Sequence, residues 1–167
     1  MKQHTVGLAR ALALGLVLAA GSVHAGVPEV EWLELMPEED IELLENMPEI
    51  SHEGNEPAEL PEELMTGRVV SAFDDKDIRI AGFVVPLEYE DDQRVTEFFL
   101  VPYYGACIHV PPPPPNQIIH VSYPEGFHVD ALYEPFWIQG RIFTERVSND
   151  TAESSYTMDA DDVTLYQ

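Results

Sequence analysis

Short apolar segments that favour β-strands fill the chain after Gly67. They are rich in β-branched and aromatic residues and are bounded by Asp, Gly and Pro. The expected strands are Arg68–Phe73, Ile78–Leu87, Val95–Val101, Ile118–Tyr123, Phe136–Phe143 and Tyr156–Tyr166. Gly82 and Gly140 interrupt two of them and permit a bend or a bulge. Because no long helix separates the strands, we expect a mainly β fold, a small OB-like antiparallel barrel, with a sandwich as the alternative.

The preceding part of the chain, residues 26–66, follows a different pattern. Pro37–Asn46 begins with proline, has acids in its first turn and repeats apolar residues near one face, which predicts a short helix. A second short helix is expected over Ala58–Met65. Trp32 and the leucines near it should tether this arm to the barrel. The chain thus divides into an acidic, proline-punctuated arm and a β-barrel domain over residues 67–167.

Residues 1–25 have the form of a cleavable secretory signal peptide. Lys2 and Arg10 supply positive charge, and residues 11–20 form an apolar run too short to cross a bilayer. Cleavage after Ala25 leaves 142 of the 167 residues, enough for one domain. We expect a periplasmic protein. No cysteine follows the apolar run, which argues against a lipid anchor.

The expected mature chain is strongly acidic. The signal peptide holds two of the eight basic residues and none of the 31 acidic ones, so the mature formal charge is −25 (6 − 31). Such a charge repels phosphate groups, which argues against nucleic acid and anionic membranes as partners. Cations and basic proteins suit it better. Solubility in a salty habitat would also explain the charge.

The only cysteine, Cys107, lies two residues before His109. In an extended backbone both side chains leave the same face, so the pair can offer two ligands to one ion. Thiolate with imidazole favours zinc, or copper, over calcium and magnesium. A packed cysteine beside a hydrogen-bonded histidine is the alternative interpretation of the same two residues.

His120 is a candidate third ligand. Five prolines at 111–115 tend to form a stiff polyproline rod of roughly 15 Å. If the chain reversed in a simple hairpin after this rod, His120 would fall short of His109. It could join Cys107 and His109 only if the rod bends or the strands close around a barrel. His128 and His52 are more distant candidates.

The segment between Tyr103 and Gln117 could instead bind a protein, because a rigid rod beside aromatic side chains loses little entropy on binding. The candidate partner-binding residues are Tyr103, Tyr104, Pro113 and Asn116. Enzymatic use of the thiol is disfavoured. Nothing marks an oxyanion hole, and no Lys or Arg lies between Arg94 and Arg141 to lower the thiol pKa.

Four unusual stretches occur together in this chain. They are Trp32-Leu33-Glu34-Leu35-Met36-Pro37, the run from Ile80 to Leu87, the run from Tyr104 to Gln117, and Met158-Asp159-Ala160. On these stretches nearly the whole mature chain resembles the DUF3299 family. The resemblance implies an exported bacterial protein, often a lipoprotein, although this chain lacks a lipobox cysteine.

Relatives in that family can occur beside ABC-transporter components and zinc-responsive genes, which implies a metal-linked accessory role. The expected function is therefore a non-enzymatic periplasmic protein that binds a transition metal, zinc or copper, and serves an envelope ABC transporter. A metal-free adaptor that uses the Tyr103–Gln117 surface is the alternative.

Overall fold

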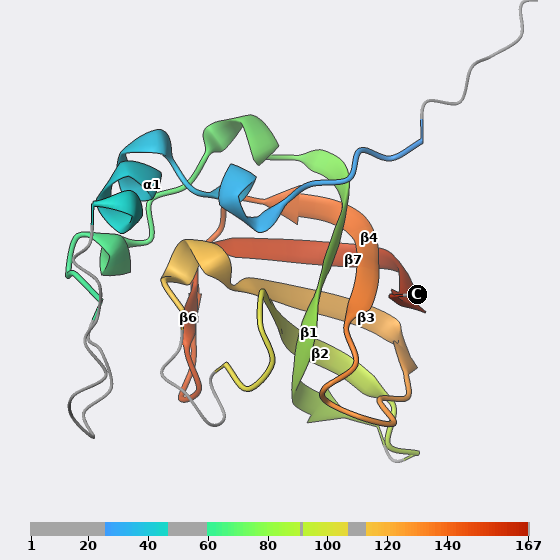
Figure 1. The fold of residues 1–167 in the computed structure, drawn as a ribbon. Coiled ribbons are helices and arrows are strands. Elements are labelled where there is room, and N and C mark those ends of the chain that lie inside the picture. Colours follow the sequence, from blue (N-terminus) through green and yellow to red (C-terminus); the bar gives the residue numbers. More distant parts are fainter. Residues whose placement is uncertain (1–25, 47–59, 91, 107–112, 167) are drawn as a thin grey trace, which may run out of the picture.

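A five-stranded closed barrel forms the body of the molecule in the computed structural model, which describes residues 26–46, 60–90, 92–106 and 113–166 (Figure 1). Its strands are β1 (Lys76–Tyr89), β2 (Val95–Val101), β3 (Ile119–Phe127), β4 (Phe136–Phe143) and β7 (Tyr156–Leu165). They are ordered β1-β2-β3-β7-β4, and β4 closes the barrel against β1. The β3–β7 pair is parallel and the other pairs are antiparallel. The predicted mainly β, OB-like barrel is confirmed.

The remaining elements are short. They are η1 (Trp32–Leu35), α1 (Glu38–Glu45), η2 (Leu64–Thr66), η3 (Ser71–Phe73), η4 (Pro115–Gln117), β5 (Val147–Ser148) and β6 (Glu153–Ser154). Helix α1 lies inside the predicted Pro37–Asn46 helix. Of the second expected helix, Ala58–Met65, residues 58 and 59 lie outside the described residues, and the rest forms a turn that leads into η2. No helix among the described residues is both long and apolar enough to cross a membrane.

Alternating side chains from every barrel strand fill the barrel. The main cluster includes Ile78, Ile80, Phe98, Leu100, Ile119, Val121, Ile138, Ile142, Tyr156 and Met158. Each of these is almost completely buried. Since fully burying such an apolar side chain contributes about 1.5–3 kcal/mol, this cluster is the main source of the barrel's stability.

Two glycines let neighbouring strands approach closely. At Gly140 the register between β4 and β7 shifts, and a Cβ atom there would overlap the Asp159 carbonyl oxygen. This confirms the expected bulge. A Cβ atom on Gly82 would lie 2.8 Å from the Val101 carbonyl oxygen of β2. Any larger residue at either position would push the strands apart.

The prediction of a strand over Arg68–Phe73 is wrong. This segment pairs with no barrel strand and ends in η3. The Val70 amide donates to the Tyr156 hydroxyl at 2.7 Å, and the Arg68 carbonyl accepts from Asn116 Nδ2 at 2.9 Å. Side chains of the barrel and of η4 therefore satisfy backbone groups that a strand would have paired in a ladder.

The N-terminal arm is held against the barrel by hydrogen bonds and buried leucines, as predicted. Trp32 Nε1 donates to the Ala81 carbonyl at 2.7 Å, and the Tyr156 hydroxyl donates to the Leu35 carbonyl at 2.9 Å. Leu35 and Leu64 are fully buried. Tyr156 thus joins the arm, the segment before β1 and the barrel core through one hydroxyl, and its burial raises the pKa of that hydroxyl.

Replacing Tyr156 with Phe should lower the free energy of unfolding by about 1–3 kcal/mol, because the Leu35 carbonyl and the Val70 amide each lose a partner. Urea denaturation of the mature chain, followed by tryptophan fluorescence, measures the change. Tyr123→Phe is the matched control. Its hydroxyl makes an exposed 3.4 Å contact with Glu125, so the variant should change stability by less than about 0.5 kcal/mol. Equal losses in both variants would contradict this role for Tyr156.

Candidate functional site

A second apolar cluster lies on the outside of the barrel, over β1 and β2. Its buried members are Val85, Phe99, Val101, Ala106 and Ile118. Successive residues of β2 point to opposite faces, so Phe98 belongs to the barrel core and Phe99 to this outer cluster. Ala106 and Ile118 come from the connection between β2 and β3. Part of that connection therefore packs against the outer wall.

The register between β2 and β3 brings the two ends of this connection together. Leu100 pairs with Ile119, and Phe99 pairs with His120. The segment that carries the candidate ligands thus starts and ends at neighbouring points on the closed barrel. Closure of the strands around a barrel is one of the two conditions under which His120 could join the other ligands.

His120 lies on the outer face of β3, beside Phe99 and Glu97. Its ring meets the Phe99 ring nearly edge-on, with the centroids 5.7 Å apart. The His120 side chain is only 19% exposed, and its Nε2 lies 3.6 Å from Glu97 Oε2. This distance is longer than the roughly 2.7–3.2 Å of a hydrogen bond between nitrogen and oxygen. The imidazole and the carboxylate are therefore close neighbours that are not hydrogen-bonded to each other.

Glu97 is a site residue that the sequence reasoning missed. It lies two residues before Phe99 on β2, on the same outer face. Because Phe99 pairs with His120, Glu97 is a diagonal neighbour of the histidine across the two strands. The alternation along β2 signalled that Glu97 points outward, but its distance from His120 depends on the strand register.

Asn116 lies at the centre of a buried polar cluster. Its Nδ2 donates to Asp40 Oδ2 at 3.1 Å and to the Arg68 carbonyl at 2.9 Å. Asp40 is fully buried and also forms an ion pair with the Arg68 guanidinium. The next residue, Gln117, donates from Nε2 to the Trp32 carbonyl at 2.9 Å. These contacts fasten η4 to α1, to the segment before β1 and to η1.

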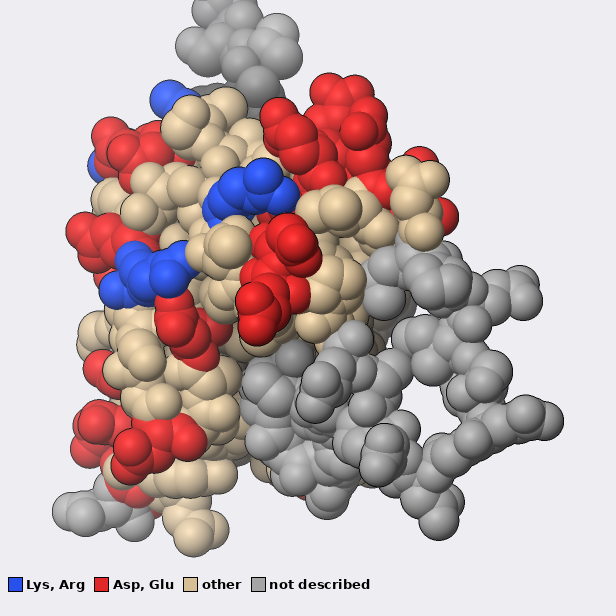
Figure 2. All heavy atoms as spheres, turned by 90° about the vertical axis from the view of Figure 1, so that its left-hand side faces the viewer, with Lys and Arg blue, Asp and Glu red and all other residues tan. Residues whose placement is uncertain are grey.

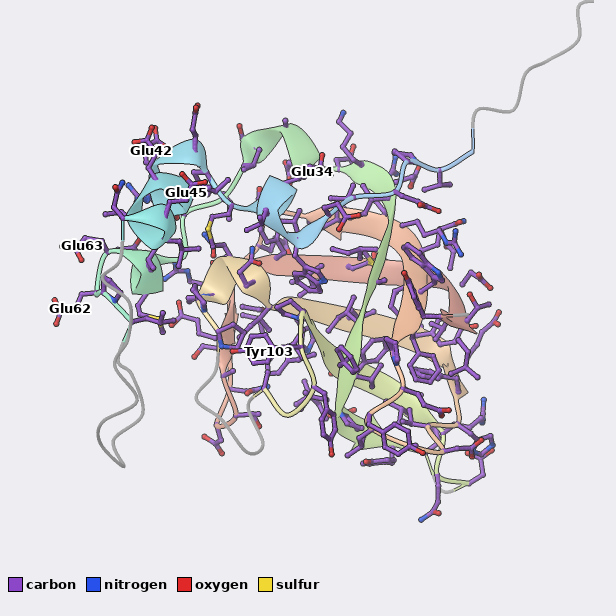
Figure 3. The ribbon with its side chains drawn as sticks, in the orientation of Figure 1. Glu34, Glu42, Glu45, Glu62, Glu63 and Tyr103 are labelled. Atoms are coloured by element: carbon purple, nitrogen blue, oxygen red, sulfur yellow. The ribbon has the colours of Figure 1, made fainter. Side chains whose placement is uncertain are left out.

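The four candidate partner-binding residues divide into two kinds. Tyr103 and Tyr104 are 42% and 50% exposed, whereas Pro113 and Asn116 are buried. Figure 3 labels Tyr103 where the chain leaves β2. The Tyr104 ring packs against Phe83 of β1, with the centroids 6.2 Å apart. Only the two tyrosines of this set offer a large area to a partner.

A small apolar pocket is lined in part by Pro102, which directly precedes Tyr103 in the sequence. Phe83 and Pro102 line it together with Trp32 from the arm, and Pro135 and Tyr166 from the last part of the chain. Its volume is about 190 Å³. Aromatic and proline side chains of this kind form typical binding surfaces for apolar groups of peptides.

Two of the three predicted metal ligands, Cys107 and His109, lie outside the described residues. The third, His120, has Glu97 as its nearest acidic neighbour. Within the ranges that the structure describes, no group of three or more His, Cys, Asp or Glu side chains is arranged to hold a metal ion. A complete site at this location would therefore need ligands from the segment between Ala106 and Pro113.

Comparisons with known proteins identify relatives of the chain and leave its activity open. A family model described as "Protein of unknown function (DUF3299)" matches residues 32–165. The crystal structure of a DUF3299 family protein, PA4066 from Pseudomonas aeruginosa PAO1, is 38% identical to this chain. The match covers 85% of this chain and 98% of that one, with a TM-score of 0.65. No curated protein matches.

Replacing Asn116 with Ala should lower the free energy of unfolding by about 1–3 kcal/mol, because the Arg68 carbonyl and the buried Asp40 carboxylate each lose a donor. Because these bonds hold α1, a Glu-specific protease should also cleave the arm faster. Denaturation and limited proteolysis measure the two effects. Asn46→Ala, which removes an exposed hydrogen bond to the Glu42 carbonyl, is the control and should change stability by at most about 0.5 kcal/mol. Unchanged cleavage of the Asn116 variant would contradict the role of Asn116 in holding the arm.

Proposed function

The chain belongs to the DUF3299 family, and from this premise we propose that it is a non-enzymatic, exported protein that binds a transition metal outside the cytoplasm. In this proposal Cys107 and His109 bind zinc, or copper, and His120 is the third ligand. The protein serves as an accessory to an envelope ABC transporter. The observation that carries the proposal is the position of His120 beside Glu97 at the base of the segment with the other two ligands.

The distance between the imidazole and the carboxylate fits two ligands of one ion. Two atoms bound to a tetrahedral zinc ion at about 2.0–2.2 Å lie about 3.3 Å apart. His120 Nε2 and Glu97 Oε2 are 3.6 Å apart, so a shift of a few tenths of an ångström would let both bind. Glu97 is therefore our candidate for a fourth ligand.

The path of the chain also supports the proposal. Ala106 is buried in the same outer cluster as Phe99, whose ring contacts His120. Cys107 is the residue after Ala106 in the sequence. Ala106 is thus the last described residue before the proposed thiolate ligand, and it belongs to the cluster that borders the histidine.

The chemistry of this set favours binding over catalysis. A thiolate, two imidazoles and a carboxylate would complete the four positions of a tetrahedral zinc ion. Catalytic zinc sites keep one position open for water or substrate, whereas sites with four protein ligands hold the ion without reaction. The acidic surface of the chain would attract the cation.

The first test is the zinc content of residues 26–167, purified without a histidine tag, incubated with zinc and passed through a desalting column. We expect close to one zinc ion per chain and little binding in Cys107→Ala and His109→Ala. His120→Ala and Glu97→Gln should each weaken zinc affinity by at least about tenfold, because each removes a proposed ligand and even outer-shell partners of ligands contribute about 10–100-fold. Binding should fall as the pH is lowered, because protons compete for the thiolate and the imidazoles.

His128→Ala is the matched control, since His128 is exposed and lies outside the β2–β3 connection. It should leave the zinc content unchanged. Urea denaturation of each variant separates loss of a ligand from loss of the fold. The same zinc content in wild type, Cys107→Ala and His109→Ala would exclude this metal site.

A metal-free adaptor is the second candidate function, and the exposure of Tyr103 and Tyr104 favours it. The pocket lined by Phe83 and Pro102 lies next to them in the chain and could receive an apolar side chain of a partner. This function requires no metal.

For the adaptor, immobilised mature protein should capture an envelope protein from a membrane extract in the presence of a metal chelator. Tyr104→Ser should reduce the captured amount at least severalfold, because it removes aromatic contact area. Tyr133→Ser is the control, since Tyr133 is 67% exposed and lies between β3 and β4. Capture that needs added zinc, or that both variants reduce equally, would count against a metal-free adaptor.

A further inference from the structure

An apolar groove lies between η1, the first turn of α1 and the segment before β1. It has a volume of about 590 Å³, which is within the usual range of about 300–1,000 Å³ for ligand sites. Leu33 of η1, Ile41 of α1 and Val70 of the segment before β1 supply apolar walls. Leu33 is 55% exposed, whereas Met36, which also lines the groove, is buried. The groove is therefore an apolar surface that is open to solvent, and it is not an enclosed cavity of the core.

Carboxylates border this groove. Glu34 and Glu38 are among its lining residues, and none of its described lining residues is Lys or Arg. The described arm, residues 26–46, has no basic residue at all, and the exposed side of α1 carries further acids. Figure 2 shows this side of the molecule, where carboxylates clearly outnumber the Lys and Arg side chains. Glu62 and Glu63 extend outward from the chain that leads into η2 (Figure 3).

We propose that this groove binds a basic amphipathic peptide segment of a partner protein, with apolar side chains in the groove and Lys or Arg against Glu34 and Glu38. The apolar walls provide contact area and the carboxylates provide charge complementarity, which increases association rate and selectivity. Glu34 Oε1 accepts a hydrogen bond from the Glu31 backbone amide. A carboxylate has further acceptor positions, so Glu34 can also accept hydrogen bonds from a Lys or Arg side chain.

Other occupants fit less well. A second copy of this chain would bring two strongly negative surfaces together, and an anionic membrane would be repelled for the same reason. The neighbouring residues 47–59 contain four glutamates and no Lys or Arg, so that segment cannot supply the positive charge. Charge complementarity therefore selects a basic partner.

The test measures binding of a short fluorescein-labelled peptide of Leu and Lys, with Leu at helical i, i+3, i+4 and i+7 spacing, to residues 26–167 by fluorescence anisotropy. An ionic strength of about 0.15 M limits long-range attraction to the acidic protein. We expect Leu33→Ser and Ile41→Ser each to weaken binding by about tenfold, equivalent to about 1.4 kcal/mol. The same peptide with Glu in place of Lys should not bind.

Two double variants that remove the same charge distinguish contacts with the carboxylates of the groove from long-range attraction by the net negative charge of the protein. Glu34→Gln with Glu38→Gln should weaken binding severalfold, and glutamine at 34 can still cap the Glu31 amide. Asp161→Asn with Asp162→Asn removes the same charge from exposed positions of β7, outside the groove, and should leave binding unchanged.

Three results would overturn the proposal. These are wild-type affinity in both serine variants, equal losses in the two double variants, and a dimer in solution that Leu33→Ser dissociates, which would assign the groove to a second copy. The zinc content of Leu33→Ser should equal that of the wild type. This measurement keeps the groove and the proposed metal site separately testable.

Discussion

A buried carboxylate holds the N-terminal arm, the proline-rich connection and the barrel in one arrangement. Asp40 is fully buried on α1, and an ionised carboxylate is stable there only if charged or polar donors surround it. Arg68 and Asn116 supply these donors from two other parts of the chain. Breaking a fully buried ion pair costs about 3–5 kcal/mol, and less is expected here because the Arg68 side chain is 45% exposed. Helix α1 can occupy this position only when both partners are in place.

The same contact determines where the β2–β3 connection returns to the barrel. Asn116 belongs to η4, so its bond to Asp40 fixes the end of the proline run over the arm, and Gln117 adds a second bond to the Trp32 carbonyl. From η4 the chain enters β3 directly, with His120 on the outer face. The position of the candidate metal ligand thus depends on a hydrogen-bond network at the arm and on strand register.

Local patterns predicted the parts of the fold that local residues control. The strands Val95–Val101 and Phe136–Phe143 have the predicted bounds, because β-branched and aromatic residues fill them and Asp, Gly or Pro residues lie close to their ends. The strand predicted over Arg68–Phe73 has a similar composition, but its backbone groups bond to Tyr156 and Asn116, which are far away in the sequence. No local pattern distinguishes a ladder from these side-chain partners.

The candidate site shows the same limit. Cys107, His109 and His120 could be identified as potential ligands from residue type and spacing, whereas Glu97 could not, since its distance from His120 follows from the pairing of two strands. The structural role of Asp40 could not be predicted from the sequence either. In the sequence it is one of five acids on a short acidic helix, and only its contacts with Asn116 and Arg68 distinguish it from its exposed neighbours.

The positions of the arginines show that, within the part of the chain that the structure describes, most acidic residues have no arginine partner. The five arginines of the described residues all form ion pairs with carboxylates; they are Arg68, Arg79, Arg94, Arg141 and Arg146. They are thus already engaged within the chain, and the charge of the many remaining acids must be balanced from solution. The side chains next to the carboxylates then determine which kind of cation binds at each of the two proposed sites. Imidazole beside a carboxylate suits a metal ion, whereas glutamates beside exposed leucine suit a basic peptide.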